Sequence, residues 1–320
     1  MGIVRMWLAV SVGLLAACPS AIDPAPVGPV SPGVEPIGTG AGLGLGRLDD
    51  RMVDFAFDGG QLEFELYRDG TRVQQVVRNR YAVAITLHWE ISGLDNVEGV
   101  SALDGTTILP AAREPLGAGE PVVIAELAQL DPSQRYHREL YFQARFGDPR
   151  ARPRPYAYAL PYPRGRSYGV LQGFHGAFSH HGSNEFAVDF ACPVATPVRA
   201  ARPGVVVAVN AIAQGAGITP EFLDDRRANF VLIRHNDGTL GEYMHLAPSG
   251  VEVRPGQAVR RGQEIGLSGN TGFSSTPHLH FQVMTAADDG LAKHSFWFEI
   301  ALGSDQASPP VEGRRYAAWE

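Results

Sequence analysis

Three separated histidine-bearing segments in the last third of the chain could together bind a metal ion and activate water. They are Ser179-His180-His181-Gly182 with Asp189 downstream, Tyr243-Met244-His245-Leu246, and Pro277-His278-Leu279-His280-Phe281. The third segment has the pattern of a loop that runs into a strand. Side chains alternate between the faces of a strand, so His278 and His280 should point the same way, about 6–7 Å apart. A metal ion bound by one of them would lie within reach of the other, which suits a ligand beside a general acid or base.

These residue types are those of a catalytic zinc centre. Such a zinc ion commonly takes three protein ligands from His, Asp or Glu and keeps a fourth position for water or substrate. Seven of the ten histidines fall between His175 and His280. Two histidines and one aspartate would leave the ion with a net positive charge, which helps to lower the pKa of a bound water toward about 7. The residues therefore indicate a zinc site that activates water.

The composition is that of a folded protein with two domains. The 320 residues leave room for two hydrophobic cores, and 44% hydrophobic with 19% charged residues is ordinary for a folded chain. The formal net charge is -7, and Lys293 is the only lysine. No basic run stands out, so nucleic acid is not an expected partner.

The N-terminal segment has the pattern of an export signal followed by a tether. The apolar run from Met6 to Ala17 is too short to span a bilayer, which needs about 20 residues. It ends in Leu15-Ala16-Ala17-Cys18, which resembles a bacterial lipobox, so residues 1–18 are expected to be a lipoprotein signal peptide with Cys18 carrying the lipid. A plain secretory signal is the alternative. Residues 19–47 are rich in Pro and Gly, as in an extended tether. The protein is therefore expected to be exported and lipid-anchored, in the outer membrane facing the periplasm.

The remaining chain predicts an all-β fold for both domains. Short alternating runs such as 61–67 and 81–89 are separated by turn residues, which is typical of a β-sandwich. Further on, strands at 229–235 and 239–246 flank Asn236-Asp237-Gly238, a strong hairpin pattern. The expected divisions are a β-sandwich-like domain at 48–148, a Pro- and Arg-rich linker at 149–165, a second, compact β domain at 166–302 and a C-terminal tail at 303–320.

Several residues that could do chemistry are better explained as structural. His88 and His137 stand alone in the first domain, and His235 opens a turn after a strand. His175 is expected to line a groove or to be structural. Cys192 lies in an apolar stretch, where cysteine usually behaves as a small buried hydrophobe.

A series of short motifs follows in order through the second domain. They occupy 180–182, 187–190, 196–206, 235–239, 243–246, 253–259, 262–266, 269–272 and His278-Leu279-His280-Phe281. The stretch from about Tyr168 to Val283 thereby resembles the lysostaphin/LytM-type zinc endopeptidases, which cut peptides in bacterial cell walls. The resemblance covers over a third of the chain, and its combination of motifs is highly specific. It implies a compact antiparallel β domain with a groove over a zinc ion.

The resemblance also implies roles for five side chains. His180, Asp189 and His280 become the zinc ligands, with His180 preferred to the adjacent His181 because it forms the His-x-Gly pattern with Gly182. His245 and His278 become the histidines that flank the attacking water. One would accept the proton of the water, and the other would stabilise the oxyanion or protonate the leaving amine. In much of the family three residues separate the first His from the Asp; here eight do, a longer form that Asn184 and Phe186 fit.

The expected function is therefore that of a zinc-dependent endopeptidase that hydrolyses peptide bonds in peptidoglycan stem peptides or cross-links. The alternative is a non-enzymatic LytM-like protein that binds the wall or regulates an amidase. A third possibility is a peptidase that acts on ordinary proteins or on the wall of a rival. The expected partners are peptidoglycan peptides, a membrane through Cys18, and a protein regulator bound by the N-terminal domain.

Overall fold

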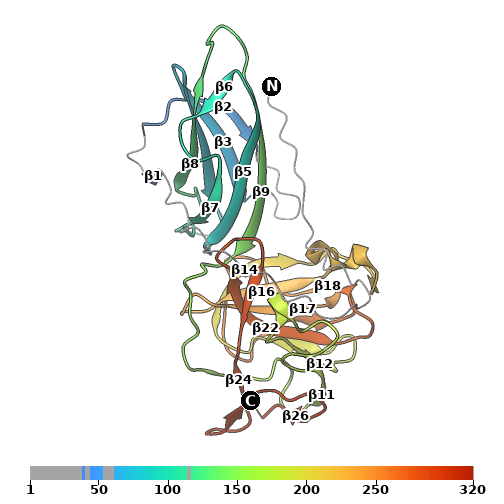
Figure 1. The fold of residues 1–320 in the computed structure, drawn as a ribbon. Coiled ribbons are helices and arrows are strands. Elements are labelled where there is room, and N and C mark those ends of the chain that lie inside the picture. The colour runs from blue at the N-terminus through green and yellow to red at the C-terminus, as the bar shows by residue number, and fades with distance from the viewer. Residues whose placement is uncertain (1–37, 40–43, 53–60, 114–116, 320) are drawn as a thin grey trace, which may run out of the picture.

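The computed structural model describes residues 38–39, 44–52, 61–113 and 117–319 (Figure 1). The regular structure of these residues is β apart from three short 3₁₀ helices, which confirms the expected all-β fold. The helices are η1 (Gly182–Asn184), η2 (Pro220–Leu223) and η3 (Asp225–Arg227). Within the described ranges, no helix is long and apolar enough to cross a membrane. The expected signal peptide with Cys18 and most of the tether lie outside the described residues.

The N-terminal body is a sandwich of two antiparallel sheets, seen in the upper half of Figure 1. The larger sheet has the order β1 (Gly38–Thr39), β8 (Pro121–Gln129), β4 (Arg72–Asn79), β3 (Leu62–Asp69) and β2 (Arg47–Met52), with β6 (Val97–Gly99) also paired to β8. The smaller sheet has the order β7 (Asp104–Leu109), β5 (Ile85–Asp95) and β9 (His137–Phe146). Apolar side chains from both sheets meet between them, where the ring centroids of Phe64 and Phe142 lie 4.3 Å apart.

The strand expected at 81–89 begins only at Ile85, because the residues before it form a loop held by Asn79. The Asn79 amide donates to the carbonyl of Val83 at 2.8 Å, and its Oδ1 accepts from the backbone N–H of Tyr81 at 2.9 Å. A side-chain amide that bonds nearby backbone in this way competes with ladder hydrogen bonds. Tyr81 and Val83 are nevertheless buried. The apolar pattern at 81–84 therefore reflects burial rather than strand geometry.

The C-terminal body is built on a long antiparallel sheet (Figure 1). Its order is β19 (Ala258–Val259), β14 (Gly204–Asn210), β16 (Phe230–Arg234), β17 (Leu240–Met244), β22 (Leu279–Ala286), β12 (Val188–Phe190), β11 (Ser167–Gln172) and β26 (Arg315–Ala317), with β23 (Lys293–Phe296) also paired to β22. A smaller antiparallel sheet joins β13 (Pro197–Arg199), β20 (Glu264–Ser268) and β18 (Leu246–Val251). Two further groups are β10 (Ala157–Tyr158) with β24 (Glu299–Ala301) and β25 (Ala307–Ser308), and β15 (Ala216–Gly217) with β21 (Gly272–Phe273).

The two faces of the long sheet have different neighbours. Because side chains alternate along β22, Phe281 lies on one face while His280 and Met284 lie on the other. Phe281 belongs to the internal core of the C-terminal body. On the other face, Met284 joins Leu232 and sandwich residues such as Ile85 in a single hydrophobic cluster. The sandwich therefore packs on the sheet face that also carries His280.

The structure differs from the sequence-based divisions at both ends of the C-terminal body. The segment expected to be a linker, 149–165, contains β10 and places Tyr158 and Tyr162 in the core. These aromatic side chains bury apolar area in spite of the prolines around them. The segment expected to be a tail, 303–320, contains β26, which pairs with β11. Both segments therefore belong to the folded body.

The thiol of Cys192 is fully buried in the core of the C-terminal body. Burial raises its pKa to about 12, so at neutral pH it is neither a thiolate nor accessible. We expect iodoacetamide to leave Cys192 unmodified in the native protein and to label it fully after denaturation. Mass spectrometry of the peptide that contains Cys192 measures this. Rapid labelling of the native protein at Cys192 would contradict a structural role.

Candidate metal centre

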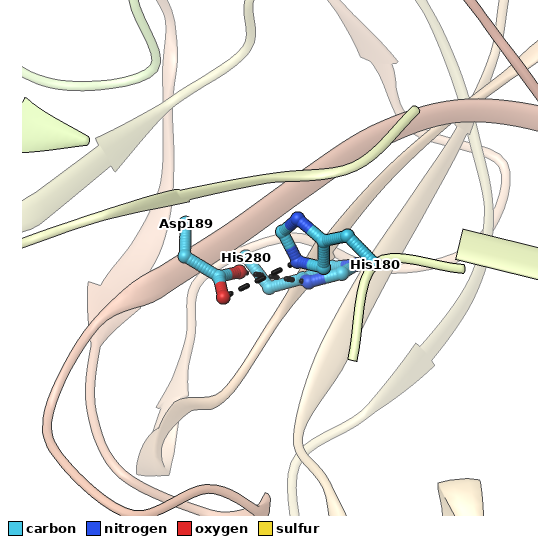
Figure 2. A group of neighbouring side chains, drawn as sticks. All are labelled: His180, Asp189 and His280. Atoms are coloured by element: carbon cyan, nitrogen blue, oxygen red, sulfur yellow. Dashed lines mark hydrogen bonds and ion pairs between the residues drawn. The ribbon is translucent and has the colours of Figure 1, made fainter. Parts of the chain in front are cut away.

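The side chains of His180, Asp189 and His280 come together at the face of the long sheet that carries His280 (Figure 2). Asp189 on β12 and His280 on β22 are direct partners in the antiparallel register, so their side chains emerge side by side on the same face. His180 reaches them from the loop that follows β11. One potential ligand atom from each of the three residues lies within 4.8 Å of the others. Two imidazoles and one carboxylate therefore converge on one point.

The ring of His180 is oriented by a backbone carbonyl. Its Nδ1 lies 2.8 Å from the carbonyl oxygen of Gly173, which can only accept, so Nδ1 carries the hydrogen. Its Nε2 is buried, lies 3.2 Å from Oδ2 of Asp189 and makes no hydrogen bond of acceptable geometry. In the neutral ring, Nε2 thus keeps a lone pair beside the carboxylate, and the two atoms are close enough to bind the same cation. The adjacent His181 is exposed, and the structure brings only His180 of this pair into the cluster.

The carboxylate of Asp189 links the two imidazoles. Its Oδ1 lies 2.9 Å from Nδ1 of His280, and its Oδ2 accepts from the side-chain amide of Gln172 at 3.2 Å. Burial alone would raise the pKa of Asp189, but the adjacent imidazoles of His180 and His280 hold that pKa well below its ordinary value. Asp189 is therefore ionised at any pH near neutrality. Imidazole nitrogens and a carboxylate oxygen are zinc ligands, so this buried set fits a zinc ion.

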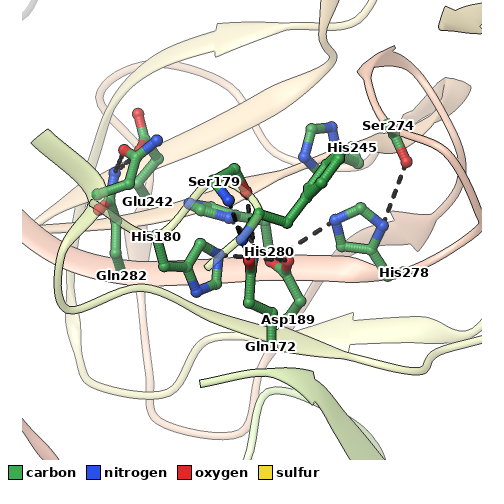
Figure 3. A network of polar contacts seen from close by, with 12 residues as sticks. Gln172, Ser179, His180, Asp189, Glu242, His245, Ser274, His278, His280 and Gln282 are labelled. Carbon is green, nitrogen blue, oxygen red and sulfur yellow. Dashed lines mark hydrogen bonds and ion pairs between the residues drawn. The ribbon is translucent and has the colours of Figure 1, made fainter. Parts of the chain in front are cut away.

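His245 faces the same site from the end of β17 (Figure 3). It adopts a left-handed backbone conformation, with φ of 64°, and its Nδ1 donates to the carbonyl of Thr271 at 2.7 Å. That hydrogen bond leaves Nε2 as an acceptor. Burial, reinforced by the neighbouring rings of His278 and His280, lowers the pKa of His245 to about 3. The ring is therefore neutral at physiological pH, and Nε2 keeps its lone pair.

His278 lies beside His245, with ring centroids 4.5 Å apart (Figure 3). Its Nδ1 donates to the carbonyl of Thr276 at 2.8 Å and is 3.2 Å from the hydroxyl of Ser274. Its Nε2 is 3.6 Å from Oδ1 of Asp189. The rings of His245 and His278 are thus each oriented by a hydrogen bond from Nδ1 to a backbone carbonyl. Nε2 of His278 faces the carboxylate of Asp189. The five histidine and aspartate side chains expected from the sequence are brought together.

A groove runs over these side chains. Apart from the site residues, its lining comes from the end of β11, the loop before His180, the end of β21 with the loop after it, and the C-terminal segment; it includes Leu171, Gln172, Ala177, Phe178, Ser179, Phe273, Ser274, Ser275, Thr276 and Glu312. The rings of Phe178 and Phe273 are stacked, with centroids 5.9 Å apart. Gln172 and Glu312 are groove residues that sequence reasoning does not identify. Both depend on the pairing of β11 with β12 and β26, which no local motif signals.

Two other histidines of this region lie away from the cluster. His175 is exposed and 3.3 Å from Glu185, and it does not line the groove. His235 is buried against Tyr158, and its Nδ1 donates to the carbonyl of Pro203 at 2.9 Å. Burial lowers the pKa of His235 to about 4, so it remains neutral in a structural position.

The cluster predicts opposite effects of pH on the metal-free and the metal-bound protein. Burial alone would lower the pKa of His180, but the adjacent Asp189 raises it above 6.5 overall. The stabilisation of the metal-free fold by this pair is therefore fully present below about pH 6.5 and lost as pH rises through the raised pKa. We expect the Tm of chelator-treated protein to fall between pH 6 and 9 for this reason, as calorimetry would measure.

The affinity for zinc should change in the other direction. Zinc must displace the proton of His180, so affinity should rise about tenfold per pH unit below that pKa and level off above it. Competition with a chromophoric chelator across the same pH range measures this. An affinity for zinc that does not vary between pH 5.5 and 7 would show that no ring proton is displaced.

A family of known proteins matches the segment that carries four of these five side chains. Residues 183–291 match peptidase family M23. Asp189, His245, His278 and His280 lie inside that segment, and His180 lies just before its start. Its placement in the cluster therefore comes from the geometry described above.

Relatives with curated names match the same part of the chain. Glycyl-glycine endopeptidase ALE-1 of Staphylococcus capitis is 38% identical over 125 residues, which are 39% of this chain and 30% of the relative. Peptidoglycan DD-endopeptidase ShyA of Vibrio cholerae is 40% identical over 96 residues, which are 30% of this chain and 19% of the relative. The catalytic domain of lysostaphin from Staphylococcus simulans is 31% identical, with a TM-score of 0.28 over 42% of this chain and 88% of that one.

These matches cover less than a third of ALE-1 and of ShyA, whose matched shares are 30% and 19%. The segment that matches the family contains β12 with Asp189 and His245 directly after β17. It also contains His278 directly before β22 and His280 on that strand. Together with the converging side chains, this identifies the C-terminal body: the chain carries a domain of peptidase family M23.

Proposed function

We propose that this protein is a zinc-dependent endopeptidase that cleaves peptide bonds in peptidoglycan stem peptides or cross-links. The observation that carries the proposal is the buried convergence of His180, Asp189 and His280, with His245 and His278 beside them in one groove. The names of two relatives, a glycyl-glycine endopeptidase and a peptidoglycan DD-endopeptidase, support peptidoglycan as the substrate class.

The side chains around the cluster suit hydrolysis of an amide. A zinc ion held by His180, Asp189 and His280 would supply a Lewis acid that polarises the scissile carbonyl and lowers the pKa of the attacking water. His245, whose Nδ1 hydrogen is held by the carbonyl of Thr271 so that Nε2 keeps its lone pair, is positioned to accept a proton from that water. His278, with its Nδ1 hydrogen held by Thr276, is placed to donate to the developing oxyanion or to the leaving amine once its Nε2 carries a proton.

The presence of all five side chains supports an enzyme over a non-enzymatic wall-binding or amidase-regulating protein. A regulator of this fold needs no oriented pair of imidazoles beside a cation site. In this chain both imidazoles are oriented by backbone carbonyls, those of Thr271 and Thr276. Such orientation is what general acid and base catalysis requires.

Digestion of purified peptidoglycan tests the proposal directly. The zinc-loaded full-length protein should release fragments whose masses, measured by mass spectrometry, correspond to cleavage of a peptide bond. Casein in a parallel reaction distinguishes wall peptides from ordinary proteins as substrates. Protein that binds zinc and yet releases no fragment from peptidoglycan would overturn the proposal.

We propose further that the protein is exported and anchored in the outer membrane through Cys18. The motif Leu15-Ala16-Ala17-Cys18 after an apolar run supports this. Replacing Cys18 by alanine should move the protein from the membrane fraction to the soluble fraction of the cell envelope. An unchanged distribution would favour a plain secretory signal. We also propose that the sandwich binds a protein regulator, because it packs on the sheet face that carries His280.

A further inference from the structure

A buried polar cluster lies on the same sheet face as His280, with Glu242 at its centre (Figure 3). The side-chain amide of Gln282 donates to Glu242 and, at 3.1 Å, to Oδ1 of Asn184. The ammonium of Lys293 lies 3.2 and 3.1 Å from the two carboxylate oxygens of Glu242. Glu242 is 5% exposed and Gln282 is fully buried. This cluster, which we call the Glu242 cluster, is outside the metal centre described above.

Burying the charges of the Glu242 cluster costs hydration free energy, because the surroundings are apolar. Neighbours on the same strands and the same face are apolar, such as Leu240 and Met284, both buried in the hydrophobic cluster that reaches the sandwich. A buried ion pair seldom stabilises a fold more than well-packed apolar residues would, because both charges lose their hydration. Lys293 is moreover the single lysine of the chain. Stability alone therefore gives a poor reason for a charged pair at this position.

The position of Glu242 relative to His280 suggests what the charge does. Glu242 is the direct cross-strand partner of Gln282, and Gln282 follows His280 by two residues on the same face of β22. Asp189 is the partner of His280 on β12, which flanks β22 on the side opposite β17. Two carboxylates thus lie on opposite sides of the His280 ring.

The two nitrogens of His280 have unequal partners. Nδ1 is 2.9 Å from Asp189, whereas Nε2 is buried and has no hydrogen-bond partner. An imidazole that gives the lone pair of one nitrogen to a cation carries its hydrogen on the other nitrogen. The N–H group on that other nitrogen is then a buried donor with a partial positive charge, which a nearby negative charge stabilises. Lys293 holds Glu242 ionised in spite of burial, which by itself would raise its pKa, so the carboxylate supplies that charge.

We propose that Glu242 is a positioning residue of the metal centre. Its buried charge, fixed by Gln282 and Lys293, stabilises one tautomer of His280. In that tautomer the hydrogen is on Nε2, and Nδ1 is free to bind the cation. The proposal rests on the metal centre of the proposed function. A carboxylate behind a metal-binding histidine makes the ring a better ligand, and loss of such a partner typically weakens metal binding about 10–100-fold.

Zinc affinity and the stability of the metal-free protein test the proposal together. The variants of the full-length protein are Glu242→Gln, Lys293→Met and the double variant Glu242→Gln/Lys293→Met, which leaves no unpaired buried cation. Zinc Kd is measured by competition with a chromophoric chelator, and Tm of the chelator-treated protein by calorimetry. We expect both variants that lack the Glu242 carboxylate to bind zinc about 10–100-fold more weakly than the wild type.

A matched control exists in the sandwich. Glu65 is also fully buried and ion-paired, with Arg51 and with Arg78, but it is remote from His280 in the fold. Glu65→Gln should lower Tm and leave zinc Kd unchanged. A double variant at Glu242 and Lys293 that folds and binds zinc as the wild type does would overturn the proposal, as would a lowered Tm with unchanged Kd. Wild-type protein that binds no zinc would overturn the metal centre itself, and with it the proposed function.

Discussion

Replacing Asp189 by alanine is expected to remove zinc binding and peptidoglycan hydrolysis together. The carboxylate is the group that both imidazoles of the cluster approach, at 3.2 Å from His180 and 2.9 Å from His280. Without it, zinc would have two neutral ligands in a buried setting, with no charge to offset its own. Since loss of an outer partner alone costs about 10–100-fold in affinity, loss of this ligand should weaken zinc binding by more than about 100-fold.

Metal analysis after dialysis and release of muropeptides from purified peptidoglycan measure the two effects of Asp189→Ala. Asp288→Ala is the matched control, because Asp288 is an exposed aspartate in the turn after β22. It should retain zinc and activity. If Asp189→Ala retained stoichiometric zinc, the ligand set would be wrong. If it lost zinc but kept activity, the metal would have no part in hydrolysis.

The chemistry of the site could be predicted because its residues obey short-range rules. Alternation along a strand places His278 and His280 in one direction. Once β12 pairs with β22, Asp189 becomes the cross-strand partner of His280. The choice between His180 and His181 depends on burial: His180 is fully buried, whereas its neighbour is exposed. Spacing alone leaves that choice open, although the His-x-Gly pattern already favours His180.

The parts that could not be predicted depend on contacts between distant segments. The wall of the groove at Glu312 exists because β26 pairs with β11 more than a hundred residues earlier in the chain. The segment at 149–165 has the composition of a linker, yet its tyrosines fill the core beside β24. The Glu242 cluster requires β17, β22 and β23 to be neighbours. Composition and local periodicity carry no signal for such pairings.

Replacing His245 by alanine should separate metal binding from catalysis. His245 is not among the three side chains of the metal cluster, and its Nδ1 is held by the carbonyl of Thr271. The variant should therefore bind zinc as the wild type does. Loss of a positioned proton acceptor should lower kcat about 10²–10⁴-fold with little change in KM, because the lost interaction acts in the transition state.

His245→Gln refines the test, since glutamine keeps a polar side chain in the groove but cannot take up a proton. We expect kcat to be as low for His245→Gln as for His245→Ala, with zinc Kd unchanged in both. His294→Ala, at an exposed histidine of β23, is the matched control and should be fully active. Steady-state kinetics on a defined muropeptide, beside chelator competition for zinc, give all of these values. A His245 variant with weakened zinc binding would make this ring a ligand, and one with wild-type kcat would leave His278 as the only imidazole for proton transfer.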